Sequence, residues 1–317
     1  MDSSPVVSVV ICTCNRAEDL RQTLAAIAQV CVPEQMPTEL LVVDNASTDH
    51  TAEVVAACQL PNMPVRSVHE AQRGKGYAYN RGMAEAKGEV FLFTDDDVRP
   101  PQNWIEGMCG PILRGEADAV AGGVKIAQHL ERAWMEGTHR IWLADTEGIN
   151  PEQPDRIVGA NMAFSRHLLE KVPEFDTELG PGALGFFDET LFSWQISKAG
   201  YRTATAFDVC VEHHFDAARL TTDSFIQSAT KMGRSYAYLA YHWKHDPEVH
   251  VYSQLMYCYF RHLLSRARRH RKYRKIGMWP GYELSMLSHI FYLRQYMIES
   301  KKPRKYDKYG LRKLRHE

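Results

Sequence analysis

The chain has 317 residues, of which 44% are apolar and 24% charged, an ordinary globular composition for one large domain or two modest ones. Its seven cysteines are odd in number and lack the spacing of a zinc site or a redox pair, so we expect free thiols in a reducing compartment. There is no signal peptide and no apolar run near 18 residues, so we expect a cytoplasmic protein, or one that is peripheral on the inner face of the cytoplasmic membrane.

The formal net charge of −1 conceals two oppositely charged parts. Residues 251–317 contain 17 Lys or Arg and 4 Asp or Glu, a net charge of +13. Subtraction from the totals of 38 and 39 leaves 21 and 35 for residues 1–250, a net charge of −14. The basic end is either a solvated surface or a surface for something anionic, such as a membrane, a phosphate-bearing lipid or nucleic acid.

The first hundred residues alternate between two kinds of pattern. Short apolar runs predict buried parallel strands at residues 6–12, 40–43, 65–68 and 89–94. Helices are expected between them, the first with Asn15 as a candidate cap, the second beginning at residues 47–49 and the third over residues 76–86. The alternation predicts an α/β fold with a mostly parallel sheet.

The rest of the chain is more varied. Strands are expected at residues 119–124, 157–164 and 202–211, and helices at 130–142, 166–171 and 188–199. Residues 146–154 and the glycine-rich residues 173–187 read as loops, and the second of these could move. Beyond residue 220 the pattern is mostly helical, with apolar positions between residues 252 and 264 recurring at helical spacing.

Polar residues follow three of the predicted strands. They are Thr13 to Asn15, Asp44 with Asn45, and Asp95 to Asp97. Ligands of open parallel sheets bind at the carboxyl ends of strands, so these residues are candidates for one site. Side chains alternate along a strand, so we expect Asp95 and Asp97 to face the site and Asp96 to face elsewhere. Carboxylates suit Mg²⁺ or Mn²⁺, although a run of three aspartates is also found in acidic turns and helix caps.

Three further groups could carry chemistry. Residues 72–76 place two cations and two glycines before a helix, which suits a phosphate or a sugar, but they form no P-loop, and no GxGxxG follows the first strand. His213 or His214 could complete a metal site. Asp188 and Glu189 open a helix, where a carboxylate either complements the helix dipole or acts as a general base.

Taken in order, these segments resemble glycosyltransferase family 2 with the GT-A fold, over roughly residues 6–240. The resemblance rests on SVVICTCNRAEDL, LLVVDNASTD, RGKGYAYNRGMAEAKGEVFLFTDDD, VGANMAFSR, and DETLFSWQISKAGYR followed by EHH. It implies a Rossmann-like mixed, mostly parallel sheet flanked by helices. We expect a catalytic domain over residues 1–220, with a nucleotide-sugar half (1–115) and an acceptor half (116–220), and a basic helical extension over residues 221–317.

The resemblance also implies roles for particular residues. Asp97 matches the cation ligand, with His213 as its partner and His214 as the alternative. Glu189 matches the catalytic base, although the order of the acidic pair is reversed relative to the family, which leaves Asp188 as the alternative. The expected donor-binding residues are Thr13, Asn15, Arg16, Asp44, Lys75, Asp95 and Asp96.

The implied reaction is an inverting transfer (hexosyltransferase type, EC 2.4) from a nucleotide-sugar, foremost a UDP-sugar, to a saccharide or lipid-linked saccharide acceptor. It would depend on Mn²⁺ or Mg²⁺ and serve cell-surface polysaccharide or glycolipid synthesis. The basic end is expected to meet an anionic membrane surface, to pair two copies in a homodimer or to pack on the core, and no nucleic acid is expected. The rival interpretations are a sugar-nucleotide pyrophosphorylase and a non-catalytic protein that binds sugar or nucleic acid.

Overall fold

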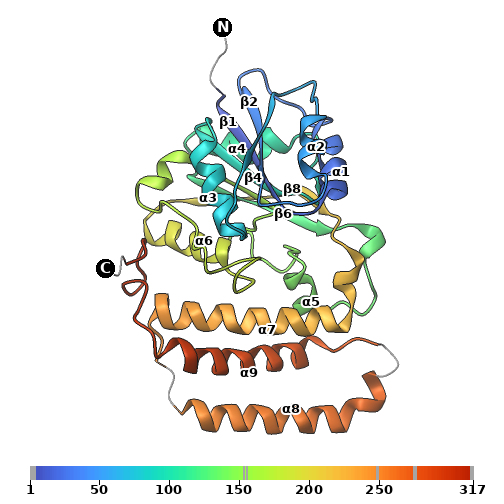
Figure 1. The fold of residues 1–317 in the computed structure, drawn as a ribbon, viewed down its shortest axis with the longest axis vertical. Helices are drawn as coiled ribbons and strands as arrows, with labels where there is room; N and C mark the ends of the chain where they lie inside the picture. The colour runs from blue at the N-terminus through green and yellow to red at the C-terminus, as the bar shows by residue number, and fades with distance from the viewer. Residues whose placement is uncertain (1–4, 153, 155, 248–249, 274–276, 315–317) are drawn as a thin grey trace. The chain divides into compact units, whose positions relative to one another are not determined.

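The computed structural model describes residues 5–314 except 153, 155, 248, 249 and 274–276, with only the backbone described for residues 268–273. The chain divides into two units. The first contains Met1–Ala127, Ala144–Thr177 and Asp188–Phe215, and the second contains Gln128–Leu143, Glu178–Phe187 and Asp216–Glu317. The first unit carries the whole described sheet, and the second is helical (Figure 1).

The sheet has eight strands in the order β3-β2-β1-β4-β7-β6-β8-β5. The strands are β1 (Val7–Thr13), β2 (Thr38–Asp44), β3 (Val65–His69), β4 (Val90–Asp95), β5 (Val98–Arg99), β6 (Ala119–Ile126), β7 (Asn161–Ser165) and β8 (Thr203–His213). β3, β2, β1 and β4 are parallel, β7 runs antiparallel to β4 and β6, and β8 runs parallel to β6. The ends of β1, β2, β4 and β8 and the start of β7 therefore lie at one edge of the sheet.

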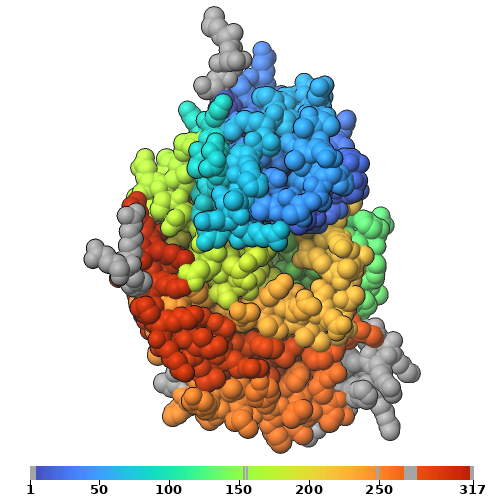
Figure 2. All heavy atoms as spheres, viewed as in Figure 1, coloured from blue at the N-terminus to red at the C-terminus, as the bar shows by residue number. Residues whose placement is uncertain are grey.

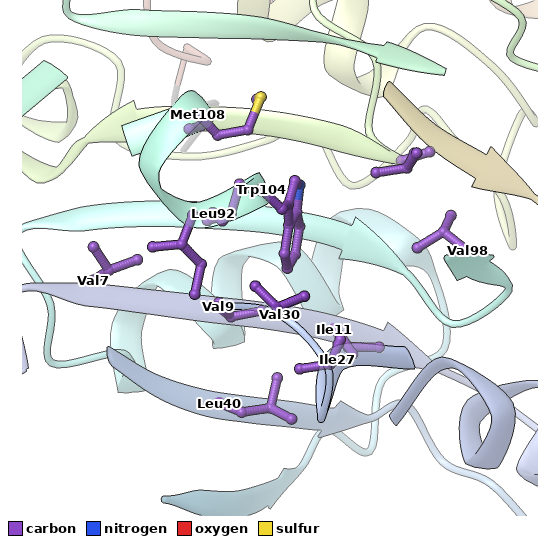
Figure 3. Close-up of a cluster of buried hydrophobic side chains, with 14 of the residues drawn as sticks. Val7, Val9, Ile11, Ile27, Val30, Leu40, Leu92, Val98, Trp104 and Met108 are labelled. Carbon is purple, nitrogen blue, oxygen red and sulfur yellow. The ribbon is translucent and has the colours of Figure 1, made fainter. Parts of the chain in front are cut away.

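The alternation of side chains along the strands creates two apolar layers. On one face, Val9 and Leu40 join a cluster that includes Trp104, drawn in Figure 3, and α1 (Ala17–Ile27), α2 (Thr51–Ala56) and α4 (Trp104–Leu113) cover it. On the other face, Val10 and Leu41 pack under α3 (Lys75–Glu85) and α6 (Asp188–Lys198). Fully burying one such aliphatic side chain stabilises the fold by about 1.5–3 kcal/mol, so the two layers hold the strand ends in place.

The predicted mostly parallel α/β sheet is confirmed, and the seven expected strands are present with modest shifts of their ends. The sequence patterns missed β5 and α4. The helix expected over residues 130–142 is shorter than predicted, because α5 (Gly137–Trp142) begins only where Glu136 and His139 form a capping box. The helix expected over residues 166–171 is a 3₁₀ turn, η2 (Arg166–Glu170).

Asn15 does not cap α1, contrary to the prediction. Its φ of 54° turns it out of the helical path, and its Oδ1 accepts from the backbone N–H of Thr48 at 2.7 Å. Asp49, from the following loop, instead accepts from the N–H of Ala17 at 3.1 Å. The start of α1 is therefore tied to the loop after β2.

The second unit contains the long helices expected beyond residue 220. They are α7 (Thr222–Tyr238), which continues into a π-helical turn (Leu239–Lys244), α8 (Val251–Tyr273) and α9 (Gly281–Glu299). Within this unit α9 lies between α7 and α8 (Figure 1). Across the described residues, no helix combines the length and the apolar character needed to cross a bilayer. All seven cysteines are described, and each is a free thiol as predicted.

Candidate active site

The two-residue strand β5 determines where the aspartate triplet meets β8. Val98 pairs with His213 in antiparallel register, and the backbone N–H of His214 donates to the carbonyl of Asp97 at 2.7 Å. This pairing sets Nε2 of His213 3.3 Å from Oδ1 of Asp97, and both side chains are almost fully buried. His214 instead places its Nε2 3.4 Å from Oε2 of Glu212. Of the two candidate histidines, His213 is therefore the one that lies against Asp97.

The guanidinium of Arg16 links two of the three aspartates. Its NH1 lies 2.9 Å from Asp96 Oδ1, and its NH2 lies 2.7 Å from Asp97 Oδ2. Thr13 donates its hydroxyl to the other oxygen of Asp96 at 2.7 Å. The expected alternation of the triplet was wrong, because the chain turns at Asp96 and Asp97 immediately after β4 ends.

The pKa values of these two carboxyls are shifted in opposite directions. Burial raises the pKa of Asp96 to about 7, against the attraction of the Arg16 guanidinium. Burial alone would also raise the pKa of Asp97, but His213 and Arg16 outweigh it and hold that pKa well below its usual range. Asp97 is thus fully ionised at neutral pH, whereas Asp96 is near the midpoint of its titration.

Asp95 points into a second cluster, at the start of α3. Nζ of Lys75 lies 2.6 Å from Asp95 Oδ1 and 5.2 Å from the centre of the Tyr79 ring. Tyr79 follows Lys75 by one helical turn, and its buried hydroxyl has no hydrogen-bond partner among the described residues. Gly159, in the turn that precedes β7, lies in the same cluster. A Cβ built on Gly159 would lie 2.4 Å from the Tyr79 hydroxyl, 3.4 Å from Lys75 Nζ and 3.5 Å from Glu189 Oε1.

The acidic pair at the start of α6 shares this cluster. Burial, and then the charge and hydrogen bond of Glu189, raise the pKa of Asp188 well above its usual range. Burial acts in the same direction on Glu189, but the hydrogen bond from Asp188 and the charge of Lys75 outweigh it and lower the pKa of Glu189. Backbone groups of Glu189 and Gly159 also hydrogen-bond this carboxylate. The two pKa values are therefore shifted in opposite directions, so Glu189, which is only partly buried, is the more readily ionised member of the pair.

Asp44 lies at the neighbouring strand end, as expected from its sequence position. Its Oδ1 accepts from the N–H of Ser47 at 3.0 Å, and its side chain is 16% exposed. Asn45 joins the next loops, because its side-chain amide donates to the carbonyl of Gln72 and accepts from the N–H of Gly74. The other oxygen of Asp44 lies 3.9 Å from Nδ1 of His69, and both residues lie beside the loop that leads into Lys75.

The structure gathers the sequence-predicted residues into three adjoining groups of the first unit. The first group contains Arg16, Thr13, Asp96, Asp97 and His213. The second contains Lys75, Asp95, Asp188 and Glu189. The third contains Asn15 and Asp44, which lie beside the other two groups. Two residues had no predicted role, Tyr79 and Gly159. Tyr79 could have been identified from the sequence, because residues four apart, such as Lys75 and Tyr79, lie on the same side of a helix. Within the described residues, no group of three or more His, Cys, Asp or Glu side chains is arranged to hold a metal ion.

Comparison with known proteins agrees with this architecture. The model of the family described as glycosyl transferase family 2 matches residues 8–172. Glycosyltransferase AglE of Haloferax volcanii is 32% identical over 123 residues, covering 38% of this chain and 40% of AglE. The probable glycosyltransferase YdaM of Bacillus subtilis is 27% identical over 186 residues, covering 56% of this chain and 44% of YdaM. The matched region therefore spans less than half of each of these relatives.

Two solved structures share the fold. The mannosyltransferase PcManGT of Pyrobaculum calidifontis, solved with GDP-Man and Mn²⁺, superposes with a TM-score of 0.59 at 20% identity, over 95% of this chain and 88% of PcManGT. Residues 1–349 of TarS from S. aureus superpose with a TM-score of 0.51 at 15% identity, over 95% of this chain and 93% of that one. The chain belongs to glycosyltransferase family 2 and has the GT-A fold.

Proposed function

We propose that this protein transfers a sugar from a nucleoside diphosphate donor to an acceptor hydroxyl, with inversion at the anomeric carbon. The observation that carries the proposal is the half-buried carboxylate of Glu189, which follows the buried Asp188 at the start of α6. The hydrogen bond from Asp188 and the charge of Lys75 lower the pKa of Glu189, which favours its ionised form. A general base needs this form, because only the ionised carboxylate can accept the proton of an attacking hydroxyl.

The two acidic residues then divide the work. Glu189 accepts the proton of the acceptor hydroxyl while the oxygen of that hydroxyl attacks the anomeric carbon. The attack comes from the face opposite the leaving diphosphate. Asp188 donates a hydrogen bond to Glu189 and fixes its orientation. The longer side chain of glutamate in the reversed pair is accommodated here by backbone hydrogen bonds from Gly159 and Glu189 itself.

The donor would lie along the strand ends. Asp44, with one oxygen engaged by the N–H of Ser47, is suited to accept a hydrogen bond from ribose or from the base. Lys75, at the first position of α3, places a cation and a helix N-terminus together, a combination that favours a phosphate. Asp95 holds that ammonium at 2.6 Å and would orient it toward the diphosphate or the sugar.

Asp97 and His213 fit a divalent cation. Their Oδ1 and Nε2 atoms are 3.3 Å apart, close to the separation of about 3 Å expected of neighbouring ligands bound at about 2.1 Å to one ion. Carboxylates suit Mg²⁺ and Mn²⁺, while imidazole suits transition metals, so the mixed pair favours Mn²⁺ over Mg²⁺. When bound, such a cation offsets the negative charge on the leaving nucleoside diphosphate.

The relatives suggest candidate donors. GDP-mannose is bound by PcManGT, and UDP-GlcNAc is bound by TarS, so both belong in a donor panel with UDP-glucose. We propose a saccharide or lipid-linked saccharide as acceptor, and a role in cell-surface polysaccharide or glycolipid synthesis. Donor hydrolysis to the free nucleoside diphosphate in the presence of Mn²⁺ identifies the donor before any acceptor is known.

Glu189→Gln tests the assignment of the base. The substitution keeps the size of the side chain but removes its ability to accept a proton, so transfer should fall by about 100-fold or more while calorimetric donor affinity changes little. Asp188→Asn is the matched variant, because asparagine can still donate a hydrogen bond to Glu189, and it should retain much more activity. Unchanged turnover in Glu189→Gln would reject this carboxylate as the base.

The same preparation separates the rival functions. Formation of a nucleoside triphosphate from an NDP-sugar and pyrophosphate would identify a pyrophosphorylase. Strongly salt-dependent binding of an anionic polymer, without release of a nucleoside diphosphate from any donor, would identify a non-catalytic binding protein. Release of a nucleoside diphosphate coupled to glycosylation of an acceptor is the result that we expect.

A further inference from the structure

Helix α8 uses only one side to pack within the second unit. Leu255 and Cys258 contact the cluster that contains Tyr292 and Tyr296 of α9. Further along, Ser265 donates to the buried carboxylate of Glu283 at 3.0 Å, on the same side of the helix. These contacts attach α8 to α9 along its length, as the adjacent helices in Figure 1 show.

The other side of α8 carries a stripe of large apolar side chains. Tyr252, Met256, Phe260 and Leu263 are 76%, 68%, 61% and 66% exposed. At 3.6 residues per turn, these four positions fall within an arc of about 80°, roughly opposite the side that packs on α9. Figure 2 shows the orange atoms of α8 bordered by the red atoms of α9. We call these four residues the α8 stripe.

The charge of α8 has one sign. The helix contains six Lys or Arg residues and no Asp or Glu. Arg261 is exposed and follows Phe260 in sequence, and its guanidinium lies over the ring of Tyr257 at 5.6 Å. In the sequence, Arg268, Arg269, Arg271 and Lys272 follow the stripe in the same helix. Apolar and aromatic residues are thus combined with cations, as in helices that lie in a membrane interface.

We propose that α8 docks on an anionic membrane surface, with the α8 stripe inserted among the lipid chains and with the positive charge of the helix attracting the acidic headgroups. Burial of the stripe removes apolar surface from water, and the cations gain from the negative surface potential. A second copy of the chain fits less well. In a symmetric dimer built on this helix, the facing helix has no acidic residue that could pair with these cations. The α8 stripe also has no counterpart in a nucleic acid, whose backbone offers charge alone.

Flotation with lipid vesicles tests the proposal without any sugar transfer, so its failure is distinguishable from a failure of the proposed function. The protein should associate with vesicles of phosphatidylcholine mixed with phosphatidylglycerol, and at least about tenfold less with phosphatidylcholine alone. Met256→Ser/Phe260→Ser keeps the charge and removes half of the α8 stripe, so it should weaken association by at least about tenfold. Leu113→Ser/Ile141→Ser is the matched control. It removes two exposed apolar side chains, 37% and 40% exposed, from α4 and α5, and should bind like the unmodified protein.

Several results would overturn the proposal. They are no association of the unmodified protein with the anionic vesicles, equal association of the stripe variant and the unmodified protein, and equal loss in the stripe variant and the control. Sedimentation in lipid-free buffer gives a further check. A dimer that dissociates in the stripe variant would assign the α8 stripe to a second copy of the chain and reject the membrane.

Discussion

Replacing Gly159 with alanine should damage the active site through a single methyl group. The added Cβ would lie 2.4 Å from the Tyr79 hydroxyl, about 1 Å closer than an ordinary contact in a close-packed interior. The Tyr79 ring cannot retreat easily, because its centre lies 5.1 Å from that of Phe93 and 4.7 Å from that of Phe175. The methyl group must therefore displace either Tyr79 or the turn before β7, where the backbone of Gly159 hydrogen-bonds Glu189.

The expected effect follows from that displacement. A misplacement of about 1 Å in a catalytic constellation costs on the order of 100-fold in kcat, which corresponds to about 2.7 kcal/mol of transition-state stabilisation. Overpacking of this kind also lowers the free energy of unfolding by about 1–3 kcal/mol. Donor turnover gives the first quantity and urea denaturation the second, so the stability effect can be measured even before a donor is identified.

Two variants make the test specific. Gly159→Ala/Tyr79→Phe removes the hydroxyl that the methyl group strikes, and should recover at least about half of the lost free energy of unfolding. Gly148→Ala is the matched control, because its Cβ would have no atom within 4 Å, and it should behave like the unmodified protein. Unchanged stability and turnover in Gly159→Ala would refute the reasoning, as would a double variant no better than the single one.

Two further predictions concern the cation ligands and the second unit. His213→Ala should weaken Mn²⁺-dependent donor binding by at least about 100-fold in calorimetry, while His214→Ala should not, because only His213 lies against Asp97. Burial acts to raise the pKa of Glu299, but hydrogen bonds from His242 and other partners lower it from 4.5 to about 2. This buried carboxylate should therefore contribute about 3 kcal/mol of stability above pH 4.5, lost as the pH falls toward 2. In urea denaturation at several pH values, Glu299→Gln should therefore be less stable than the unmodified protein above about pH 4.5. The difference between the two should shrink as the pH falls toward 2.

Each of these predictions has a result that contradicts it. Equal effects of His213→Ala and His214→Ala on donor binding would contradict the inference that only His213 binds the cation. A pH-independent difference between Glu299→Gln and the unmodified protein would assign the stability to packing instead of ionisation. Glu174 is exposed, so Glu174→Gln is the matched control for the removal of one carboxylate.

The strands β1, β2 and β4 of the parallel half could be predicted because they are buried on both faces and contain continuous apolar runs. β5 could not, because two residues carry no periodicity and the strand exists only through its pairing with β8. The same limit explains the helix expected over residues 130–142. The aromatic pattern was real, but the local capping by Glu136 and His139, which no count of apolar positions includes, delays the start of α5.

Within the site, the sequence predicted which residues meet better than it predicted how they meet. Strand ends identified Asp44, Asp95 and Asp97, since parallel strands place them at one edge. The pairing of Asp96 with Asp97 through Arg16 depends on a turn that follows β4, and strand periodicity does not extend into it. Gly159 escaped notice because its importance lies in the space that its missing side chain leaves to Tyr79, a residue 80 positions away in the chain.

The short pairing of β5 with β8 makes the spacing of Asp97 and His213 a property of strand register. Because side chains alternate along a strand, a slip of one residue would turn His213 to the opposite face of the sheet. The distance between Asp97 and His213 therefore cannot change gradually. The loops among the 115 residues between them can therefore change in length and composition without altering it, provided that β5 and β8 keep their pairing. Loops that determine sugar and acceptor specificity can therefore diverge in evolution or be redesigned, while Asp97 and His213 keep the same separation.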